Sequence, residues 1–398
     1  MKLDKPYLII DLNDNKIIFL VILFNEQKNF KILKKIILES SGIQNGHIID
    51  IEIVSQLLKK NINNIEEEIN YFFSDVAIII NPNEINCLNV SGYKKLNGSQ
   101  VSNEDIIYIL NNIKKIILEN EINYFLVHLF NSNFSLDSDN LENLPIGLFG
   151  DFYNQNMTFF LVNKNIIKNI KLVFNNCGLN IEKIILKPFA ESVYLLSHNL
   201  SHQNFTILRL GKESINVSLF KNKSFVFTEN FDFGFNLINK DISKLCTLKI
   251  EEVENLLKEV ELKNIIEINN ESFLDKKYFY VSPYRKIKYQ LILDVFTARL
   301  EELFEICYKK NNNIKKSENN KIYVYVDSSE YFKNIRYILE KNKLTTFECI
   351  FDSSSEYSLQ TAVLGASEII GKGWEKEAIP IIYKKKSYIS GFFSKLFS

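Results

Sequence analysis

The chain contains one pattern of three strand-like segments twice, and this repeat constrains its fold more than any other feature. The first copy has apolar segments at 7–11, 16–24 and 30–38. The second copy has matching segments at 205–210, 215–220 and 224–231. The run Asn13–Asp14–Asn15 suits the first turn, because Asn and Asp tolerate the left-handed backbone of tight hairpins. The repeat therefore predicts two similar lobes, each opening with three antiparallel strands.

Each copy continues with alternating helical and strand-like patterns. In the first, apolar residues recur at helical spacing from Asp50 to Phe73, with Asp50 as the N-cap, and a short buried strand follows at 76–80. Two β-β-β-α-β-α halves are typical of the α/β fold shared by actin, Hsp70 and sugar kinases. In that fold two lobes hold ATP and Mg²⁺ between two hairpin turns, although the fold alone assigns no function.

The patterns divide the chain into two lobes, each with a subdomain, followed by a linker and a terminal helix. The first lobe is expected at 1–200, with an inserted subdomain at about 81–156. The second lobe is expected at 201–370, with an outer subdomain at about 232–318. A Gly-, Pro- and Lys-containing linker at 371–386 and a C-terminal helix at 387–398 complete the division.

Composition excludes several classes of protein. Lys and Arg number 48, and Asp and Glu also number 48, so the excess positive charge of a typical nucleic-acid binder is missing. The five Cys are scattered and form no CxxC pair, which indicates reduced thiols and gives no zinc motif. His198 and His202 are four residues apart but have no third ligand nearby, so no metal site is predicted. The longest apolar run, 17–24, is far shorter than a membrane-spanning helix, and the N-terminus has no features of a secretory signal.

Seven short motifs, in order, resemble those of FtsA, a membrane-tethered actin homologue of bacterial cell division. They lie at 41–50 (SGIQNGHIID), 101–106 (VSNEDI), His128, 143–150 (NLPIGLFG), 177–185, 190–194 and 361–365 (TAVLG). Each match alone is weak or moderate, but their order and spacing extend over nearly the whole chain. The resemblance implies an actin/Hsp70-like two-lobed fold, an inserted subdomain of the FtsA 1C type and a C-terminal amphipathic helix.

The first phosphate-binding turn implied by the resemblance is altered. Asp11 and Lys16 match the family pattern, whereas Asn13 replaces its Gly and Asp14 replaces its small hydroxyl residue. Gly turns hold phosphates through closely approaching backbone N–H groups, so the substitution of Gly weakens the site. The carboxylate of Asp14 would also repel a phosphate.

The second turn and the adenosine loop are altered as well. Gly211 and Ser214 persist, but Arg209 and Asn216 replace the two Asp residues of the pattern. The segment 326–329 lacks the Gly pair expected beside adenosine. Asp11, Lys16, Gly211 and Ser214 are therefore expected to form a vestigial nucleotide site, with no catalytic residues. No cofactor is firmly predicted, and tight binding of ATP with Mg²⁺ is not expected.

The C-terminal twelve residues have a strongly amphipathic pattern. At helical spacing, Ile389, Phe392, Phe393, Leu396 and Phe397 share one face, while Ser390, Ser394, Lys395 and Ser398 lie opposite. Such a helix suits the interface of a membrane, and its lysine, Lys395, suits anionic lipid. FtsA also ends in an amphipathic membrane-targeting helix after a linker. The alternative is a helix that docks on the protein's own core.

A partner site is implied in the outer subdomain, where FtsA proteins bind the C-terminal peptide of the tubulin homologue FtsZ. The helix carrying Arg299 and Glu302 resembles the family's helix at that site. Two interpretations of Arg299 remain open. It either contacts an acidic residue of the peptide or forms an ordinary i,i+3 ion pair with Glu302.

The favoured interpretation is a peripheral division protein at the cytoplasmic face of the inner membrane. It would anchor FtsZ filaments, self-associate into actin-like filaments and bind other division proteins, with weak or lost ATPase activity and no nucleic-acid partner. One alternative is the related actin-like scaffold of type IV pilus assembly, which lacks the terminal amphipathic helix. Another is an active ATP-dependent enzyme of the same fold, against which the altered turns argue.

Overall fold

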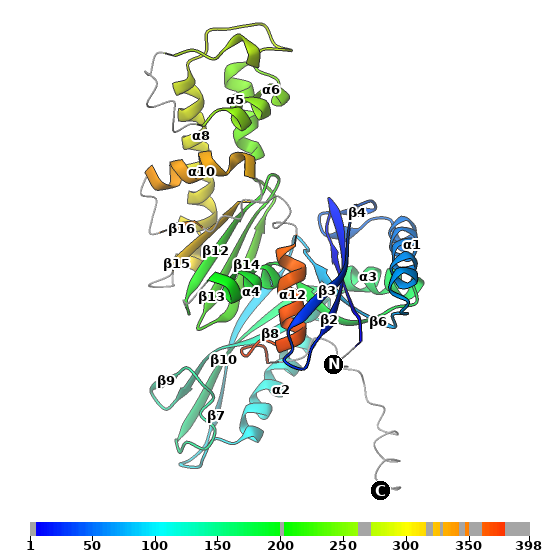
Figure 1. The fold of residues 1–398 in the computed structure, drawn as a ribbon. Helices are drawn as coiled ribbons and strands as arrows, with labels where there is room; N and C mark the ends of the chain where they lie inside the picture. The colour runs from blue at the N-terminus through cyan, green and yellow to red at the C-terminus, as the bar shows by residue number, and fades with distance from the viewer. Residues whose placement is uncertain are drawn as a thin grey trace.

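The structure is a computed structural model, and it describes residues 5–199, 203–261, 272–315, 321–326, 329–341, 347–349 and 360–378. Two lobes lie side by side, and an inserted subdomain extends from the first lobe beneath the second (Figure 1). The helices α4 (Lys187–Asn199) and α12 (Thr361–Lys372) lie between the lobes. The expected mixed α/β, two-lobed architecture is confirmed.

The first lobe is built on a five-stranded sheet in the order β11-β6-β1-β2-β3. The first three strands are antiparallel, and β6 and β11 run parallel to β1. The strands are β1 (Tyr7–Leu12), β2 (Lys16–Phe24), β3 (Phe30–Glu39), β6 (Asp75–Ile80) and β11 (Asn180–Leu186). The helices α1 (Ile51–Ile69) and α3 (Lys164–Asn176) accompany this sheet, and a short hairpin pairs β4 (Ile43–Gln44) with β5 (His47–Ile48). Asp50 caps α1 through its carboxylate, which accepts a hydrogen bond from Ile53 N, as predicted.

The second lobe repeats this topology in the order β14-β13-β12-β15-β16. The strands are β12 (Phe205–Leu210), β13 (Ile215–Lys221), β14 (Ser224–Phe231), β15 (Lys321–Val326) and β16 (Phe347–Cys349). Residues 236–259 form two helices, because Thr247 adopts φ 53° and ends the first of them. The helices of this lobe are α5 (Asn236–Cys246), α6 (Ile250–Glu259), α8 (Tyr289–Phe304), α9 (Asn312–Lys315) and α10 (Ser329–Lys341), with a 3₁₀ turn at Lys276–Tyr278 and a π-turn at Glu305–Lys309.

The inserted subdomain has its own sheet and its own apolar core. Its strands, in the order β7-β10-β8-β9, are β7 (Asn86–Lys95), β8 (Tyr124–Leu136), β9 (Asp139–Leu141) and β10 (Phe152–Asn163). The helix α2 (Asn103–Asn120) packs against this sheet and begins with the predicted capping box, in which Ser102 and Asp105 hydrogen-bond reciprocally.

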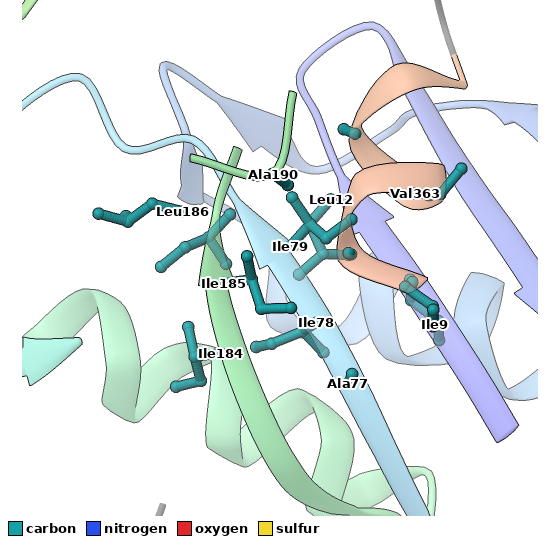
Figure 2. Packing of buried hydrophobic residues seen from close by; sticks show 14 of the residues in the cluster. Ile9, Leu12, Ala77, Ile78, Ile79, Ile184, Ile185, Leu186, Ala190 and Val363 are labelled. Carbon is teal, nitrogen blue, oxygen red and sulfur yellow. The ribbon is translucent and has the colours of Figure 1, made fainter. Parts of the chain in front are cut away.

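The inner parts of the two lobes share one continuous apolar core. Phe225 of the second lobe stacks on Phe160 with a centroid distance of 4.4 Å, and its ring also lies near those of Phe130 and Phe189. Figure 2 shows the first-lobe side of this core, where isoleucines of β6 and β11 pack beneath α12. At the crossing of α4 and α12, a Cβ on Gly365 would lie only 1.8 Å from the carbonyl oxygen of Ala190. The helices therefore contact each other backbone to backbone.

The end of the described chain differs from the expected linker. Residues 371–372 complete α12, and Glu377 forms an antiparallel bridge with Phe130 of β8. The part of 371–386 that the structure describes is thus packed on the protein, because its backbone finds hydrogen-bond partners along β8. The expected terminal helix at 387–398 lies outside the described residues, as do its six proposed membrane-binding residues, Ile389, Phe392, Phe393, Lys395, Leu396 and Phe397.

Candidate functional site

A polar cleft of about 430 Å³ lies between the lobes. Both hairpin turns of the repeat reach it, the first between β1 and β2 and the second between β12 and β13. Its lining residues are Asn13, Asn15, Asn81, Lys187, Pro188, Glu191, Arg209, Gly211, Lys212, Glu213, Ser214, Asn216 and Asn230. Of the four residues of the expected nucleotide site, Gly211 and Ser214 line the cleft, whereas Asp11 and Lys16 are not among the lining residues. The segment expected beside adenosine includes 327–328, which lie outside the described residues.

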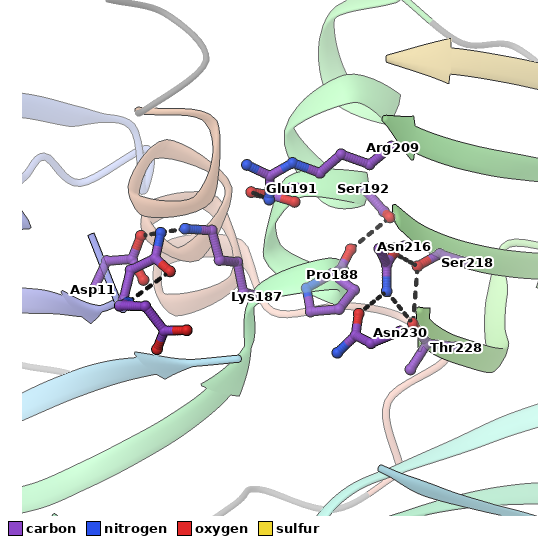
Figure 3. Close-up of polar contacts among 12 residues, drawn as sticks. Asp11, Lys187, Pro188, Glu191, Ser192, Arg209, Asn216, Ser218, Thr228 and Asn230 are labelled. Carbon is purple, nitrogen blue, oxygen red and sulfur yellow. Dashed lines mark hydrogen bonds and ion pairs between the residues drawn. The ribbon is translucent and has the colours of Figure 1, made fainter. Parts of the chain in front are cut away.

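Asp11 is fully buried and forms an ion pair with Lys187, one of the lining residues of the cleft. Its Oδ2 atom is 3.0 Å from Nζ of Lys187, and both side chains are almost fully buried (Figure 3). Oδ1 of Asp11 is also buried, and it has no hydrogen-bond partner among the described residues. The pairing follows from the sheet order, because β11 leads directly into Lys187 and β6 alone separates β11 from β1. Oδ2 of Asp11 therefore pairs with Lys187, and Oδ1 is the oxygen of this carboxylate that could accept a further hydrogen bond.

The first turn is tied to the first lobe through Asp14. Its Oδ1 atom accepts a hydrogen bond from Gly46 N at 2.8 Å, and its own N–H donates to Oδ1 of Asn13. Gly46 is itself tightly packed, since a Cβ there would lie 2.3 Å from the carbonyl oxygen of Asn81. The carboxylate that replaces the family's small hydroxyl residue thus holds two loops of the first lobe together.

The second turn is tied to the start of α5. Gly211 N–H donates across the hairpin to the carbonyl of Ser214 at 2.9 Å. Phe235 N donates to the carbonyl of Gly211 at 3.1 Å, and Asn236 N donates to that of Lys212 at 3.0 Å. A phosphate-binding turn presents backbone N–H groups to its ligand. Here the N–H of Gly211 is used within the hairpin, and the carbonyls of Gly211 and Lys212 fix the turn to the start of α5.

Charged side chains of the second turn also have partners within the protein. Nζ of Lys212 lies 2.8 Å from Oε1 of Glu254 on α6, and Glu213 accepts a hydrogen bond from the side chain of Asn236. Arg209 pairs through Nη1 with Oε1 of Glu191 at 2.5 Å (Figure 3). Because Glu191 is on α4 and Arg209 on β12, this pair connects the helix between the lobes to the second sheet.

Asn216, which stands where the family pattern has Asp, is the centre of a hydrogen-bond network (Figure 3). Its amide nitrogen donates to Oδ1 of Asn230 at 2.7 Å and to Oγ1 of Thr228 at 3.0 Å, and its amide oxygen accepts from Ser218. Asn230 in turn donates to the carbonyl of Pro82 at 3.0 Å, which joins the second lobe to the first. A neutral amide can both donate and accept here, which a carboxylate could not.

The expected partner residue Arg299 contacts its own lobe. Its Nε atom lies 2.5 Å from Oδ2 of Asp241 on α5, and its Nη1 atom lies 2.6 Å from Oε2 of Glu302. The predicted i,i+3 pair with Glu302 is therefore present, and the second contact joins α8 to α5. About 29% of the Arg299 side chain remains exposed.

A second surface of the outer subdomain was not singled out from the sequence. We call residues 276–288 the basic strip: they include five Lys or Arg residues and no acidic residue. The exposed cations are Lys276, Lys277, Arg285, Lys286 and Lys288. Tyr280, Val281 and Tyr284 are exposed beside them, by 54%, 57% and 43%. The composition KKYFYVSPYRKIK is the signal that points to this surface.

The basic strip is held in place by a buried carboxylate. Glu252 of α6 accepts hydrogen bonds from Val281 N, Ser282 N and Ser282 Oγ of the strip, and from Lys249 N at its own helix start. Burial alone raises the pKa of Glu252, but these hydrogen bonds, led by those from Ser282, outweigh burial and lower it to about 2. The strip therefore rests on an ionised, fully hydrogen-bonded side chain.

The part of the chain that the structure describes contains no cluster of three His, Cys, Asp or Glu side chains suited to a metal ion. His202, half of the His pair considered above, lies outside it. Among the helices that the structure describes, none has the length and apolarity needed to cross a bilayer.

Comparison with known proteins supports the resemblance to FtsA. No protein-family model matches the chain. It is 21% identical over 307 residues to the cell division protein FtsA of Buchnera aphidicola subsp. Schizaphis graminum, covering 77% of this chain and 72% of that protein. It is 21% identical over 269 residues to FtsA of Bacillus subtilis (67% of this chain, 61% of the relative) and 20% identical over 204 residues to FtsA of Escherichia coli K12 (51% and 48%). The chain thus spans about half the length of the Escherichia coli relative.

A solved structure shares the two-lobed fold. The PilM–PilN type IV pilus biogenesis complex superposes with a TM-score of 0.52 at 10% identity, over 93% of this chain and 98% of that one. At this identity the likeness concerns the fold alone. Taken with the duplicated sheet topology and the matches to FtsA, it supports one conclusion: the chain is a divergent relative of the cell division protein FtsA, built on an actin-like two-lobed fold.

Proposed function

We propose that this protein anchors FtsZ filaments to the inner face of the bacterial cytoplasmic membrane and helps assemble the division machinery. The observation that carries the proposal is the sequence similarity to FtsA over 77% of the chain. The protein would act as a peripheral membrane protein at the division site, through binding surfaces, with weak or absent nucleotide chemistry.

The basic strip is the proposed contact for the FtsZ C-terminal peptide. Exposed Lys and Arg side chains attract an acidic segment, and the exposed Tyr280, Val281 and Tyr284 provide apolar area for its hydrophobic residues. Lys276 lies 5.5 Å from the ring centroid of Tyr284, and the hydroxyl of Tyr280 accepts a hydrogen bond from Asn255 at 2.8 Å. These contacts restrict the side chains before binding, which reduces the entropy lost when a peptide docks.

Arg299 is proposed to support this surface rather than to carry the peptide contact. Its guanidinium is engaged by Asp241 and Glu302, so a peptide carboxylate would have to compete with two carboxylates already present. This choice between the two interpretations of Arg299 can be tested by comparing its substitution with substitutions in the basic strip.

The tail at 387–398 is the proposed membrane anchor, on the strength of its amphipathic pattern. Burial of five large apolar side chains in the lipid interface would provide most of the affinity, and Lys395 would favour anionic lipid. Vesicle co-sedimentation of the full chain tests this, with Phe393→Glu and Phe397→Glu as variants that interrupt the apolar face.

The cleft contacts support weak nucleotide binding. Lys187, Arg209 and Lys212 each have a carboxylate partner, and the N–H of Gly211 bonds to the carbonyl of Ser214. Mg²⁺ takes oxygen ligands, and Oδ1 of Asp11 is the carboxylate oxygen that fits that need, whereas Arg209 stands at a position where the family pattern has Asp. We infer that the residues present suit a nucleotide phosphate with Mg²⁺ poorly, and no catalytic step is proposed.

Self-association is proposed through the inserted subdomain. Its loop at 144–151 exposes Leu148 and Phe149 by 51% and 71%, and Tyr93 of β7 is exposed by 76%. Backbone hydrogen bonds from Gly147 N to Val101 O and from Val101 N to Leu148 O hold this loop in place. Sedimentation velocity of Phe149→Ser against the unaltered chain tests whether the loop supports assembly.

Peptide binding tests the basic strip directly. A fluorescent FtsZ C-terminal peptide is titrated with the full chain and with the double variant Arg285→Glu, Lys286→Glu. We expect a loss of affinity of more than tenfold for this variant, and little change for Lys60→Glu, an exposed lysine of α1 in the other lobe. If the double variant keeps its affinity and Arg299→Ala loses affinity, the peptide contact lies at Arg299 and not at the basic strip.

The scaffold of type IV pilus assembly remains the second candidate, because the PilM–PilN complex shares the fold. A pilus role predicts binding of an inner-membrane pilus protein and no dependence of vesicle binding on residues 387–398. The same vesicle experiment therefore separates the two functions.

A further inference from the structure

The residues that follow α12 form a short strap, Trp374–Ala378, which we call the latch. Its backbone pairs with residues 129–131 of β8, whereas β9 pairs with residues 134–136 of the same strand. Asn131 N donates to the carbonyl of Lys376 at 2.9 Å, and Ala378 N donates to the carbonyl of Leu129 at 2.7 Å. The latch thus adds a short antiparallel bridge to the sheet of the inserted subdomain.

Side chains of the latch reach the other parts of the molecule. Nε1 of Trp374 donates to the carbonyl of Lys223, in the β13–β14 turn of the second lobe, at 3.0 Å. The ring of Trp374 lies edge-on to Phe189 of α4, with a centroid distance of 6.1 Å. Nζ of Lys376 donates to the carbonyl of Glu142 at 2.7 Å. The latch therefore contacts the inserted subdomain, the second lobe and the helix between the lobes at once.

The centre of the latch is a buried contact between Glu377 and His128 of β8. Leu186 N donates to Nε2 of His128 at 3.1 Å, so the ring proton must be on Nδ1, which lies 2.8 Å from Oε1 of Glu377. Nζ of Lys183, on β11, lies 3.5 Å from Oε2 of the same carboxylate. The side chains of His128 and Glu377 are 0% and 7% exposed. Both ring nitrogens of His128 thus have hydrogen-bond partners while the latch is docked on β8, and this arrangement requires a neutral imidazole.

The surroundings of His128 disfavour a second proton. Burial lowers the pKa of His128, Glu377 of the latch opposes that effect, and Lys183 of β11 adds to it. The rings of Phe130 on β8 and Phe189 on α4 cover the imidazole at centroid distances of 5.5 and 5.0 Å. A proton on Nε2 would also face the N–H of Leu186 and remove that hydrogen bond. An open latch, by contrast, would expose His128 to water and allow it to titrate normally.

We propose that the latch is a pH-sensitive closure, seated while His128 is neutral and released when His128 takes up a second proton. Release frees the chain that leads to residues 379–398 from the inserted subdomain and the second lobe together. Acidification favours the open state, because only the open state accepts the proton. This device is independent of whether the tail binds a membrane or the basic strip binds FtsZ.

The composition of the chain provides a direct probe. Trp374 is the single tryptophan, so tryptophan fluorescence of the full chain reports on the latch. With an open-state pKa of about 6.5, the opening constant should rise about tenfold between about pH 7.5 and about pH 5.5. We expect Trp374 emission to shift to longer wavelength over that range while far-ultraviolet circular dichroism stays constant. Loss of this pH response is expected in His128→Asn, whose amide can still donate to Glu377, and not in the control His47→Asn, a change at an exposed histidine of β5.

Hydrogen exchange gives a second measurement that needs no variant. The amides of Asn131 and Ala378 form the bridge, so their protection factors in the full chain should fall about tenfold over the same pH range. Amides in the centre of β2 should keep theirs. Protection at Asn131 and Ala378 that does not change with pH, or a Trp374 response that persists in His128→Asn, would overturn the proposal.

Discussion

Nζ of Lys187 lies 3.0 Å from Oδ2 of Asp11, in an ion pair that is almost completely buried beside the cleft. This contact neutralises the carboxylate that the family pattern retains at the first turn. It also joins the start of α4 to the end of β1. The pair is therefore a structural element of the first lobe as well as a feature of the cleft.

Removal of the cation alone should destabilise the protein. Lys187→Met leaves the Asp11 carboxylate buried without its charge partner, and we expect a loss of about 3–5 kcal/mol in the free energy of unfolding. The double variant Asp11→Asn, Lys187→Met should lose less, because no buried charge is then uncompensated. Urea unfolding followed by circular dichroism measures both. Equal losses of unfolding free energy in the single and double variants would show that lost packing, and not the uncompensated charge, causes the destabilisation.

Nucleotide binding is expected to be weak. Isothermal titration of the full chain with ATP and Mg²⁺ should give no heat at micromolar nucleotide, because Arg209 and Lys212 already have carboxylate partners and the N–H of Gly211 bonds within its own hairpin. Tight binding would mean that Arg209 and Lys212 leave their carboxylate partners for the phosphates. In that event Arg209→Ala should abolish the binding, and the account of the cleft given above would be wrong.

Glu252 should give the basic strip a pH-dependent stability. Its pKa is lowered to about 2, so the unfolded chain binds a proton at higher pH than the folded chain does. The stabilisation from this group is therefore complete above about pH 4.5 and is lost as the pH falls towards 2. Glu252→Gln should cost about 1–3 kcal/mol near neutral pH, through unsatisfied N–H donors, and less near pH 3. The control Glu251→Gln, one residue earlier and exposed, should change little at either pH.

The crossing of α4 and α12 should not tolerate a side chain at Gly365. Alanine is the better helix former by about 1 kcal/mol, but its Cβ would overlap the carbonyl of Ala190. We expect Gly365→Ala to lower stability by about 3 kcal/mol, since neither helix backbone can move without opening the shared core. Thermal unfolding measures the effect. Lys372→Ala, at an exposed position of the same helix, controls for helix propensity; a stabilised Gly365→Ala would contradict the backbone contact.

Features encoded by neighbouring residues were predictable from the sequence. Asp50 caps α1 and Ser102 caps α2 through side chains three residues away from the amides they bind, so local spacing was sufficient. The duplicated three-strand pattern was sufficient to predict the three antiparallel strands of each sheet, because apolar strand segments and the hairpin turns between them are local as well. The break between α5 and α6 was not predictable in this way, because it depends on the left-handed backbone of the single residue Thr247.

Contacts between distant residues were not predictable in the same way. Lys187 meets Asp11 only because the sheet places β11 two strands from β1, and no periodicity encodes that neighbourhood. Glu377 and His128 are 249 residues apart, and the glycines at 371 and 373 suggested a linker where the latch is docked. The basic strip is visible in composition, but its order depends on Glu252, which comes from another helix.

Recruitment of FtsZ to lipid vesicles is the direct test of whether this chain anchors FtsZ to a membrane. Vesicles containing anionic lipid are incubated with the full chain and with FtsZ from the same organism. No ATP is added, and the vesicles are then sedimented. We expect FtsZ to sediment with the vesicles only when the chain is present. The double variant Phe393→Glu, Phe397→Glu in the tail should abolish this sedimentation of FtsZ, and so should Arg285→Glu, Lys286→Glu in the basic strip. Vesicle binding by the chain should be lost in the first double variant and kept in the second. FtsZ that stays in the supernatant while the unaltered chain binds vesicles would contradict the proposed anchoring function.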